Sequence, residues 1–245
     1  MSSHFSEKVR THKIISLLLS LLAVIVVITP LFYFRSVRKL EDPRIVKVKF
    51  YEKQYDKLTK NKDLKNAFKY LDSIESVFIK YDDYKNSFEM GQILNRKAVN
   101  WLQLAIAEKN DSFRIYDLDS AKIFAENSIT IYELWISEFR HLSRNEIIIK
   151  IQSNYLPNEP LFKGKNLVTI INKRTDEILK AQKETPLHLS LAYTNLGSIY
   201  QYFGDYKMAI KNNRKAIEIW SSNETAKTNI EFLIDRTLNK KDSNY

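Results

Sequence analysis

Few side chains in this sequence have the types and spacings that perform catalysis or bind metal. The histidines are His4, His12, His141 and His188, and no two of them form a His-x-x-x-His pair. Cysteine is absent, which excludes disulfides, zinc–thiolate sites and thiol nucleophiles. No Gly-x-Ser-x-Gly elbow or glycine-rich phosphate loop occurs. The sequence therefore predicts a chain that is not an enzyme and that binds no metal or cofactor.

Two acidic pairs, Glu41–Asp42 and Asp82–Asp83, are the remaining candidates for general acid–base chemistry. Both lie in segments with the composition of turns or linkers, and turn chemistry accounts for them more simply. An unrecognised catalytic site in the irregular segment 140–165 is a further alternative. We expect function to reside in a binding surface instead.

The composition indicates an all-α chain with a basic surface. The 245 residues include only four glycines and five prolines, and few breakers with little strand alternation favour helices. The formal net charge is +10, with the basic residues spread along the chain. We interpret most of them as solvated helix-surface residues, while an anionic partner remains the alternative.

Residues 14–34 are apolar apart from two serines and one threonine. About 21 residues at roughly 1.5 Å rise each span the hydrocarbon core of a bilayer, so this segment predicts a transmembrane helix. Phe32, Tyr33 and Phe34 suit an interfacial aromatic belt. The run exceeds a signal-peptide core and no small-x-small cleavage site follows, which favours a permanent anchor over a cleaved signal peptide.

The flanks of the apolar segment give conflicting signals for orientation. The N-terminal tail, residues 1–13, is short and basic, as in signal-anchors, but residues 35–49 are also rich in Lys and Arg. Long domains translocate largely regardless of charge. The sequence therefore predicts a single-pass inner-membrane protein of a bacterium with a periplasmic domain. A cytoplasmic domain, with 35–49 against anionic lipid, is the alternative.

Beyond a linker at 35–44, the chain reads as helices separated by short turns. Apolar residues recur at helical spacing through most of 45–240, and residues 241–245 form a polar tail. We expect a loop at 109–119 before a helix at about 120–139, and Pro186 is expected to end a helix that begins near 166. A succession of helix pairs suggests an internal repeat.

Segment 190–223 contains the clearest repeat. Counted from Ser190 as position 1, positions 4, 7, 8, 11, 20 and 27 hold Tyr193, Leu196, Gly197, Tyr200, Ala209 and Ala216. This pattern resembles the tetratricopeptide repeat (TPR), although Asn213 replaces its aromatic at position 24 and Ser221 its proline at position 32. The resemblance implies a solenoid of helical hairpins over 45–240, with more degenerate copies elsewhere and a capping helix at 224–239.

The small residues of this segment have a physical explanation. Glycine within a helix costs about 1 kcal/mol relative to alanine, so Gly197 indicates that another helix approaches it closely. Gly204 follows the apolar run, where a left-handed C-cap is expected. Asp205 is suited to cap the N-terminus of the next helix.

The resemblance also implies a binding surface, because the first helix of each TPR hairpin lines the concave face. The corresponding residues are Leu191, Thr194, Asn195, Ser198, Gln201 and Tyr202. They are mostly polar, which suits hydrogen bonds to a peptide backbone. Asn195 matches an asparagine with which some TPR domains grip a terminal carboxylate, but the basic partners of that clamp are missing here.

We therefore expect a membrane-anchored adaptor that recruits or assembles a protein partner at a bacterial inner membrane, as in envelope or flagellar periplasmic machinery. In this interpretation the chain binds a protein or peptide and no nucleic acid. The alternative is a basic membrane-proximal module that binds anionic lipid or nucleic acid electrostatically. A steep dependence of affinity on salt would distinguish that module.

Overall fold

Helices make up all the regular secondary structure in the part of the chain that the structure describes. This structure is a computed structural model that describes residue 26 and residues 41–242, with side chains as far as residue 236. The elements are α2 (Val46–Lys60), α3 (Leu64–Phe78), α4 (Asp82–Lys85), α5 (Phe88–Ala107), α6 (Asp111–Phe139), α7 (Arg144–Ile151), η1 (Gln152–Asn154), η2 (Pro160–Phe162), α8 (Leu167–Phe203), α9 (Tyr206–Ile219) and α10 (Glu224–Asp242). No strand occurs among these residues, so the all-α prediction is confirmed.

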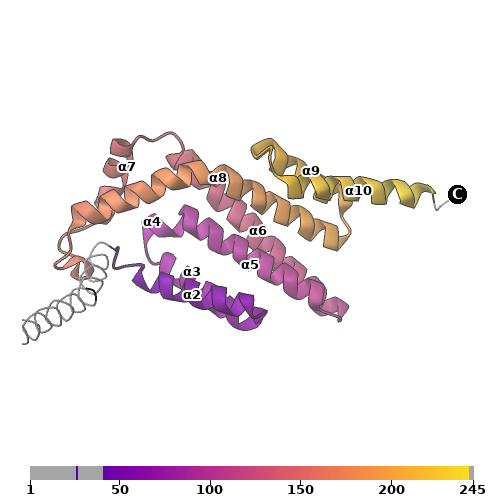
Figure 1. Cartoon of the computed structure of the whole chain (residues 1–245), viewed down its shortest axis with the longest axis horizontal. Coiled ribbons are helices and arrows are strands. Elements are labelled where there is room, and N and C mark those ends of the chain that lie inside the picture. The colour runs from indigo at the N-terminus through magenta and orange to yellow at the C-terminus, as the bar shows by residue number, and fades with distance from the viewer. Residues whose placement is uncertain (1–25, 27–40, 243–245) are drawn as a thin grey trace, which may run out of the picture.

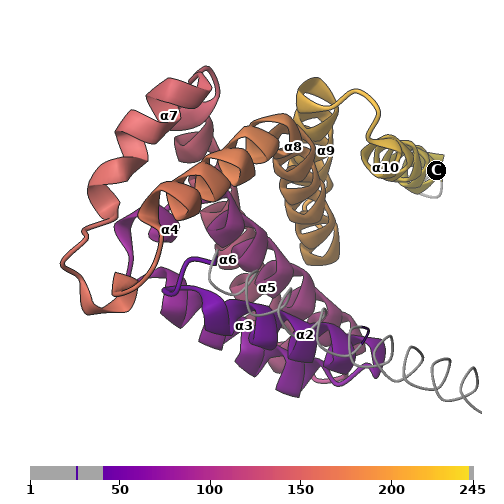
Figure 2. The ribbon, with the colours of Figure 1, turned by 60° about the vertical axis from the view of Figure 1, so that its left-hand side comes forward.

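Helices that follow one another pack as hairpins (Figure 1). The hairpins are α2–α3, α5–α6 and α8–α9, joined by turns at 61–63, 108–110 and 204–205. The second helix of each pair also packs against a later helix: α3 contacts α5, α6 contacts α8, and α9 contacts the single helix α10. Figure 2 shows α9 beside the C-terminal half of α8, with α10 beyond it. Two clusters of buried apolar residues lie between these helices.

Two helix boundaries differ from the sequence-based expectation. The helix α6 begins at Asp111, because the side chain of Asn110 accepts hydrogen bonds from the backbone N–H groups of Ser112 and Phe113 at 3.0 and 3.2 Å. The expected loop at 109–119 is therefore mostly helical. This difference places several aromatic side chains of the segment on one ordered helix.

The second difference is that Pro186 lies inside α8 rather than at its end. Proline removes one backbone hydrogen bond, but neighbouring residues on both sides, Ala181, Thr185 and Leu189, are buried against the rest of the molecule. Gln182 also donates to the carbonyl groups of Phe139, at 2.5 Å, and Leu142, at 2.9 Å. Tertiary packing thus holds α8 in one piece across the proline.

The close helix approach predicted at Gly197 is present. A Cβ atom on Gly197 would overlap the side-chain amide of Asn213 in α9 and lie 3.1 Å from the carbonyl oxygen of Ala209. Gly91 in α5 plays the same role, because its Cβ would lie 2.6 Å from Cε1 of Tyr132 in α6. The sequence analysis did not recognise this second approach.

The caps predicted at the turn between α8 and α9 are also confirmed. Gly204 has the left-handed backbone conformation, with φ of 81°, and the side chain of Asp205 accepts a hydrogen bond from the backbone N–H of Met208 at 3.0 Å. The remaining repeat residues are in the core or at its edge: Leu196, Ala209 and Ala216 are buried, and Tyr193 and Tyr200 pack against the buried cluster.

The localisation predicted from the sequence is contradicted. Apart from Val26, the predicted anchor at 14–34 lies outside the described residues, as do the tail 1–13 and residues 35–40 of the linker. Among the residues that the structure does describe, none of the helices combines the length and the apolar character that crossing a bilayer requires. The longest, α8, carries charged residues such as Lys173, Arg174 and Asp176, and a charge at the bilayer centre costs about 3 kcal/mol or more. The single-pass inner-membrane assignment is therefore corrected.

Replacing Gly197 by alanine is expected to destabilise the α8–α9 hairpin. The added methyl group must displace Asn213, whose Nδ2 donates to the Ala209 carbonyl at 2.9 Å and whose Oδ1 accepts from Asn229 at 3.2 Å. We expect a loss of about 1–2 kcal/mol in urea unfolding, since overpacking outweighs the better helix propensity of alanine.

The Asn213→Ala background provides the control for this substitution. Gly197→Ala should cost about 1 kcal/mol less there, because the clashing amide has been removed. An equal cost in both backgrounds would contradict the close approach as the reason for glycine.

Candidate functional site: the polar row of α2, α5 and α8

Polar side chains join the first helices of neighbouring hairpins. Asn195 Nδ2 in α8 donates to Asn95 Oδ1 in α5 at 2.9 Å, and Gln92 Nε2 lies 3.4 Å from Nε2 of His188. Toward α2, Tyr55 Oη donates to Asn100 Oδ1 of α5 at 3.4 Å. We define the polar row as Glu52, Tyr55, Gln92, Asn95, Arg96, His188 and Asn195.

Arg96 is the cation at the centre of the polar row. Its guanidinium carbon lies 5.5 Å from the ring centroid of Tyr55. Burial raises the pKa of Glu52, and the charge of Arg96 opposes that rise. Burial lowers the pKa of His188; attraction to Glu184 opposes this shift, and repulsion from Arg96 adds to it. Arg96 is thus coupled electrostatically to α2 and to α8 at the same time.

The six residues predicted for the binding face do not share one environment. Asn195 belongs to the polar row, and Tyr202 is 50% exposed at the end of α8. Thr194 is buried, and Asn223 Nδ2, before α10, donates to its hydroxyl at 2.9 Å. Ser198 donates to the Thr194 carbonyl at 3.1 Å. Leu191, Gln201 and Ser198 are half-buried.

The sequence analysis missed the residues that α5 contributes. Gln92, Asn95 and Arg96 recur at helical spacing in α5, and residues three and four apart share a helix face. This polar stripe was the available signal. His188 was judged isolated in the sequence, because its partner lies 96 positions earlier in the chain.

A buried charge cluster is the second candidate, because perturbed ionisable groups often mark functional sites. Arg44, before α2, pairs with Asp42 at 2.7 Å and with Asp83 of α4 at 2.8 Å. Arg174 of α8 binds the carboxylate of Glu89 in α5 through two hydrogen bonds of 2.6 and 3.1 Å. Asp42 and Asp83 are therefore buried ion-pair partners and not the simple turn residues that the sequence analysis expected.

Tyr84 links the two halves of this cluster. Its ring centroid lies 5.4 Å from the guanidinium carbon of Arg44 and 4.5 Å from that of Arg174, and its hydroxyl donates to Asp42 at 3.2 Å. Burial would raise the pKa of Glu89, but the Arg174 guanidinium outweighs it and holds that pKa below its usual value. Burial raises the pKa of Asp83 despite attraction to Arg44.

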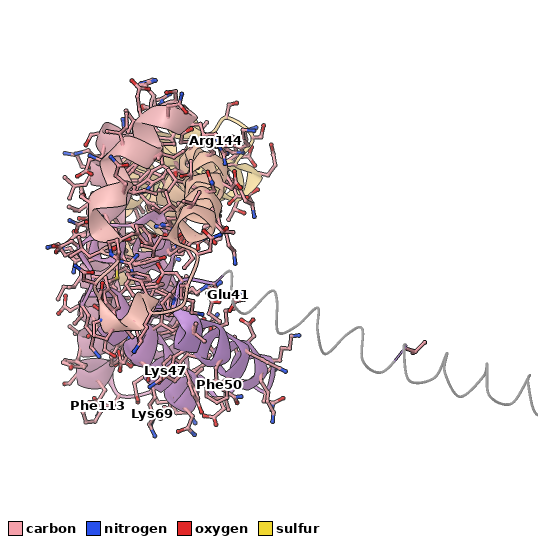
Figure 3. The ribbon with its side chains drawn as sticks, turned by 90° about the vertical axis from the view of Figure 1, so that its left-hand side faces the viewer. Glu41, Lys47, Phe50, Lys69, Phe113 and Arg144 are labelled. Atoms are coloured by element: carbon pink, nitrogen blue, oxygen red, sulfur yellow. The ribbon has the colours of Figure 1, made fainter. Side chains whose placement is uncertain are left out.

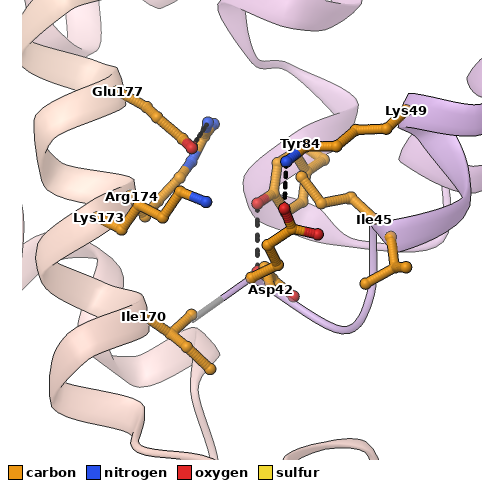
Figure 4. A pocket seen from close by; sticks show the side chains of 10 residues that line it. Asp42, Ile45, Lys49, Tyr84, Ile170, Lys173, Arg174 and Glu177 are labelled. Carbon is orange, nitrogen blue, oxygen red and sulfur yellow. Dashed lines mark hydrogen bonds and ion pairs between the residues drawn. The ribbon is translucent and has the colours of Figure 1, made fainter. Parts of the chain in front are cut away.

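Two cavities adjoin the cluster. One, of about 220 Å³, lies along Asp83, Trp135 and Arg174, and the other is small (Figure 4). The cavity lined by Asp42, Tyr84 and Arg174 measures about 40 Å³, which is room for water rather than for a substrate. Within residues 41–236, no group of His, Asp and Glu side chains is placed to hold a metal ion. We interpret the cluster as a structural junction between the start of α2, α4, α5 and α8.

Comparison with known proteins adds no relative. The chain matches no protein-family model, no curated protein and no solved structure. The resemblance to the TPR consequently rests on the sequence pattern of 190–223.

The imidazole of His188 is expected to titrate below its ordinary pKa of 6.5. Its folded pKa is lower than its unfolded pKa, so its contribution to stability is complete above about pH 6.5 and declines as the pH falls toward the folded value. Arg96→Gln should raise the His188 pKa and Glu184→Gln should lower it further, as measured by NMR titration. A His188 pKa above 6.5 would contradict this environment.

Breaking the Arg174–Glu89 pair is expected to destabilise the protein more than removing the outer partner of the same arginine. Glu89→Gln should cost about 2–3 kcal/mol, because it leaves the buried Arg174 without its bidentate carboxylate. Glu177→Gln is the matched control: its carboxylate is 3.4 Å away and 41% exposed, and we expect a loss below about 1 kcal/mol. Equal losses in urea unfolding would refute the assigned roles.

Proposed function

We propose that this protein is a non-enzymatic adaptor, a TPR-like solenoid of helical hairpins that binds a segment of another protein along the polar row. The order of helix contacts supports a solenoid, since the second helix of each hairpin packs against the first helix of the next: α3 on α5 and α6 on α8, with α9 on α10. Such an arrangement places the first helices side by side and creates an extended binding face.

The single observation that carries the proposal is the polar row itself. Amide groups of Gln92, Asn95 and Asn195 lie at the junction of two helices, half-buried. Carboxamides offer both donors and acceptors, which match the alternating N–H and C=O groups of a peptide backbone. Arg96 adds a cation that can pair with a carboxylate of the bound segment.

A partner bound in this way would make its main contacts through hydrogen bonds and not through diffuse charge. We therefore expect the affinity to depend weakly on salt, although the chain carries a net charge of +10. Binding of nucleic acid through many phosphate contacts would instead give a log–log salt slope of several units.

Photo-crosslinking in the native host tests the proposal. A benzoylphenylalanine at Tyr202, which lies about two turns beyond Asn195 on the same face of α8, should crosslink one partner protein. The same group at Ile149 of α7, which is 66% exposed, serves as the control and should not capture that protein. Arg96→Gln should reduce the yield from Tyr202 by about fivefold or more, the usual loss at a central contact.

Two results would overturn the proposal. One is identical products from positions 202 and 149, which would indicate non-specific proximity. The other is crosslinking chiefly to nucleic acid, with a yield that falls steeply as salt is raised. Circular dichroism of the Arg96→Gln variant establishes that a lost crosslink is not a lost fold.

A further inference from the structure

An aromatic pocket lies on the opposite side of α5 from the polar row. Trp101 follows Arg96 by five residues, which at about 100° per residue turns it roughly 140° around the helix. The pocket has a volume of about 440 Å³ between α3, α5 and α6. Its lining includes Phe68, Trp101, Glu108, Phe113, Tyr116 and Asp117. Figure 3 shows Phe113 at the end of the molecule away from Arg144.

Three rings of this pocket, those of Phe68, Trp101 and Tyr116, pack edge to face. Trp101 meets Phe68 edge to face, with centroids 5.3 Å apart, and meets Tyr116 in the same way at 6.0 Å. Phe113 and Tyr116 are 64% and 63% exposed. Aromatic faces carry partial negative charge and attract cations within about 6 Å, with tryptophan the strongest.

Two carboxylates lie beside these rings. Glu108 and Asp117 form no ion pair with any side chain of the region that the structure describes. Burial raises the pKa of Asp117, repulsion from Glu108 adds to the rise, and Lys65, the cation that also lines the pocket, opposes it. Glu108 accepts hydrogen bonds from the backbone N–H groups of Lys109 and Asn110, both at 2.9 Å, which fixes its position.

The chain contains another site in which aromatic rings, including that of Phe68, and carboxylates surround a cation. The ammonium of Lys97 lies 5.1 Å from the Phe68 ring and 5.0 Å from the Phe124 ring, and it pairs with the carboxylates of Asp72 and Glu75. Two aromatic rings and two carboxylates thus hold one buried lysine there. The aromatic pocket repeats this combination without a cation in contact with its carboxylates.

We propose that the aromatic pocket binds a lysine or arginine side chain of a partner protein. The aliphatic stem would lie against Trp101 and Leu104, and the charged end would sit between the ring faces and the carboxylates of Glu108 and Asp117. The net charge of the pocket is negative although that of the chain is +10, which favours a basic segment. The pocket does not involve the polar row, so either proposal can fail alone.

NMR titration of the full chain with a small probe tests the proposal. The sequence has three tryptophans, so the Trp101 indole signal can be assigned by its loss in Trp101→Phe. N-acetyl-lysine methylamide should shift this signal saturably, while the uncharged N-acetyl-norleucine methylamide should bind about tenfold more weakly, because the cation provides most of the attraction. Glu108→Gln with Asp117→Asn should weaken lysine-probe binding by about tenfold.

Asp119→Asn is the matched control, since this carboxylate is exposed on the same helix but does not line the pocket. It should leave the affinity for the lysine probe unchanged. Equal binding of both probes would show an apolar patch only, and no shift of the Trp101 signal would exclude a site; either result overturns the proposal. A Trp101 signal that shifts on dilution without any probe would also overturn it, because a second copy of this chain would then occupy the pocket.

Discussion

A charged side chain that is buried must be paired with an opposite charge. In this molecule such pairs join segments that are far apart in the sequence. Arg44 and Arg174 are almost fully buried, and each is held by carboxylates from a different element. Because an unpaired buried charge would cost several kcal/mol, the start of α2, α4 and α5 must keep their positions relative to α8. The α2–α3 and α5–α6 hairpins and the N-terminal half of α8 therefore meet at one junction.

Close packing at two glycines holds the helices of the α5–α6 and α8–α9 hairpins together. Gly91 admits Tyr132 between α5 and α6, and Gly197 admits Asn213 between α8 and α9. A side chain at either position would push the helices apart, and in a densely packed interior such a shift spreads to neighbouring elements. Between α5 and α8 the Asn95–Asn195 hydrogen bond of 2.9 Å joins the two hairpins that these glycines hold together.

Helix α5 presents two chemically different faces as a result. One face contributes amides and Arg96 to the polar row, where hydrogen bonds dominate. The opposite face contributes Trp101 and Leu104 to the aromatic pocket, and Glu108 follows in the turn after α5; ring faces and carboxylates dominate there. In the proposed adaptor, a backbone segment and a basic side chain of the partner would bind on opposite sides of α5, which packs against α6.

Local signals in the sequence were sufficient for the helical class, the α8–α9 hairpin, the close approach at Gly197 and the caps at Gly204 and Asp205. Each depends on residues within one or two turns, where spacing and backbone preference act directly. Only the tertiary structure decided that α8 continues through Pro186, that Asp83 pairs with Arg44, and that Asn195 meets Asn95. These features join residues far apart in the chain, and no local pattern specifies which distant partner will satisfy a buried polar group.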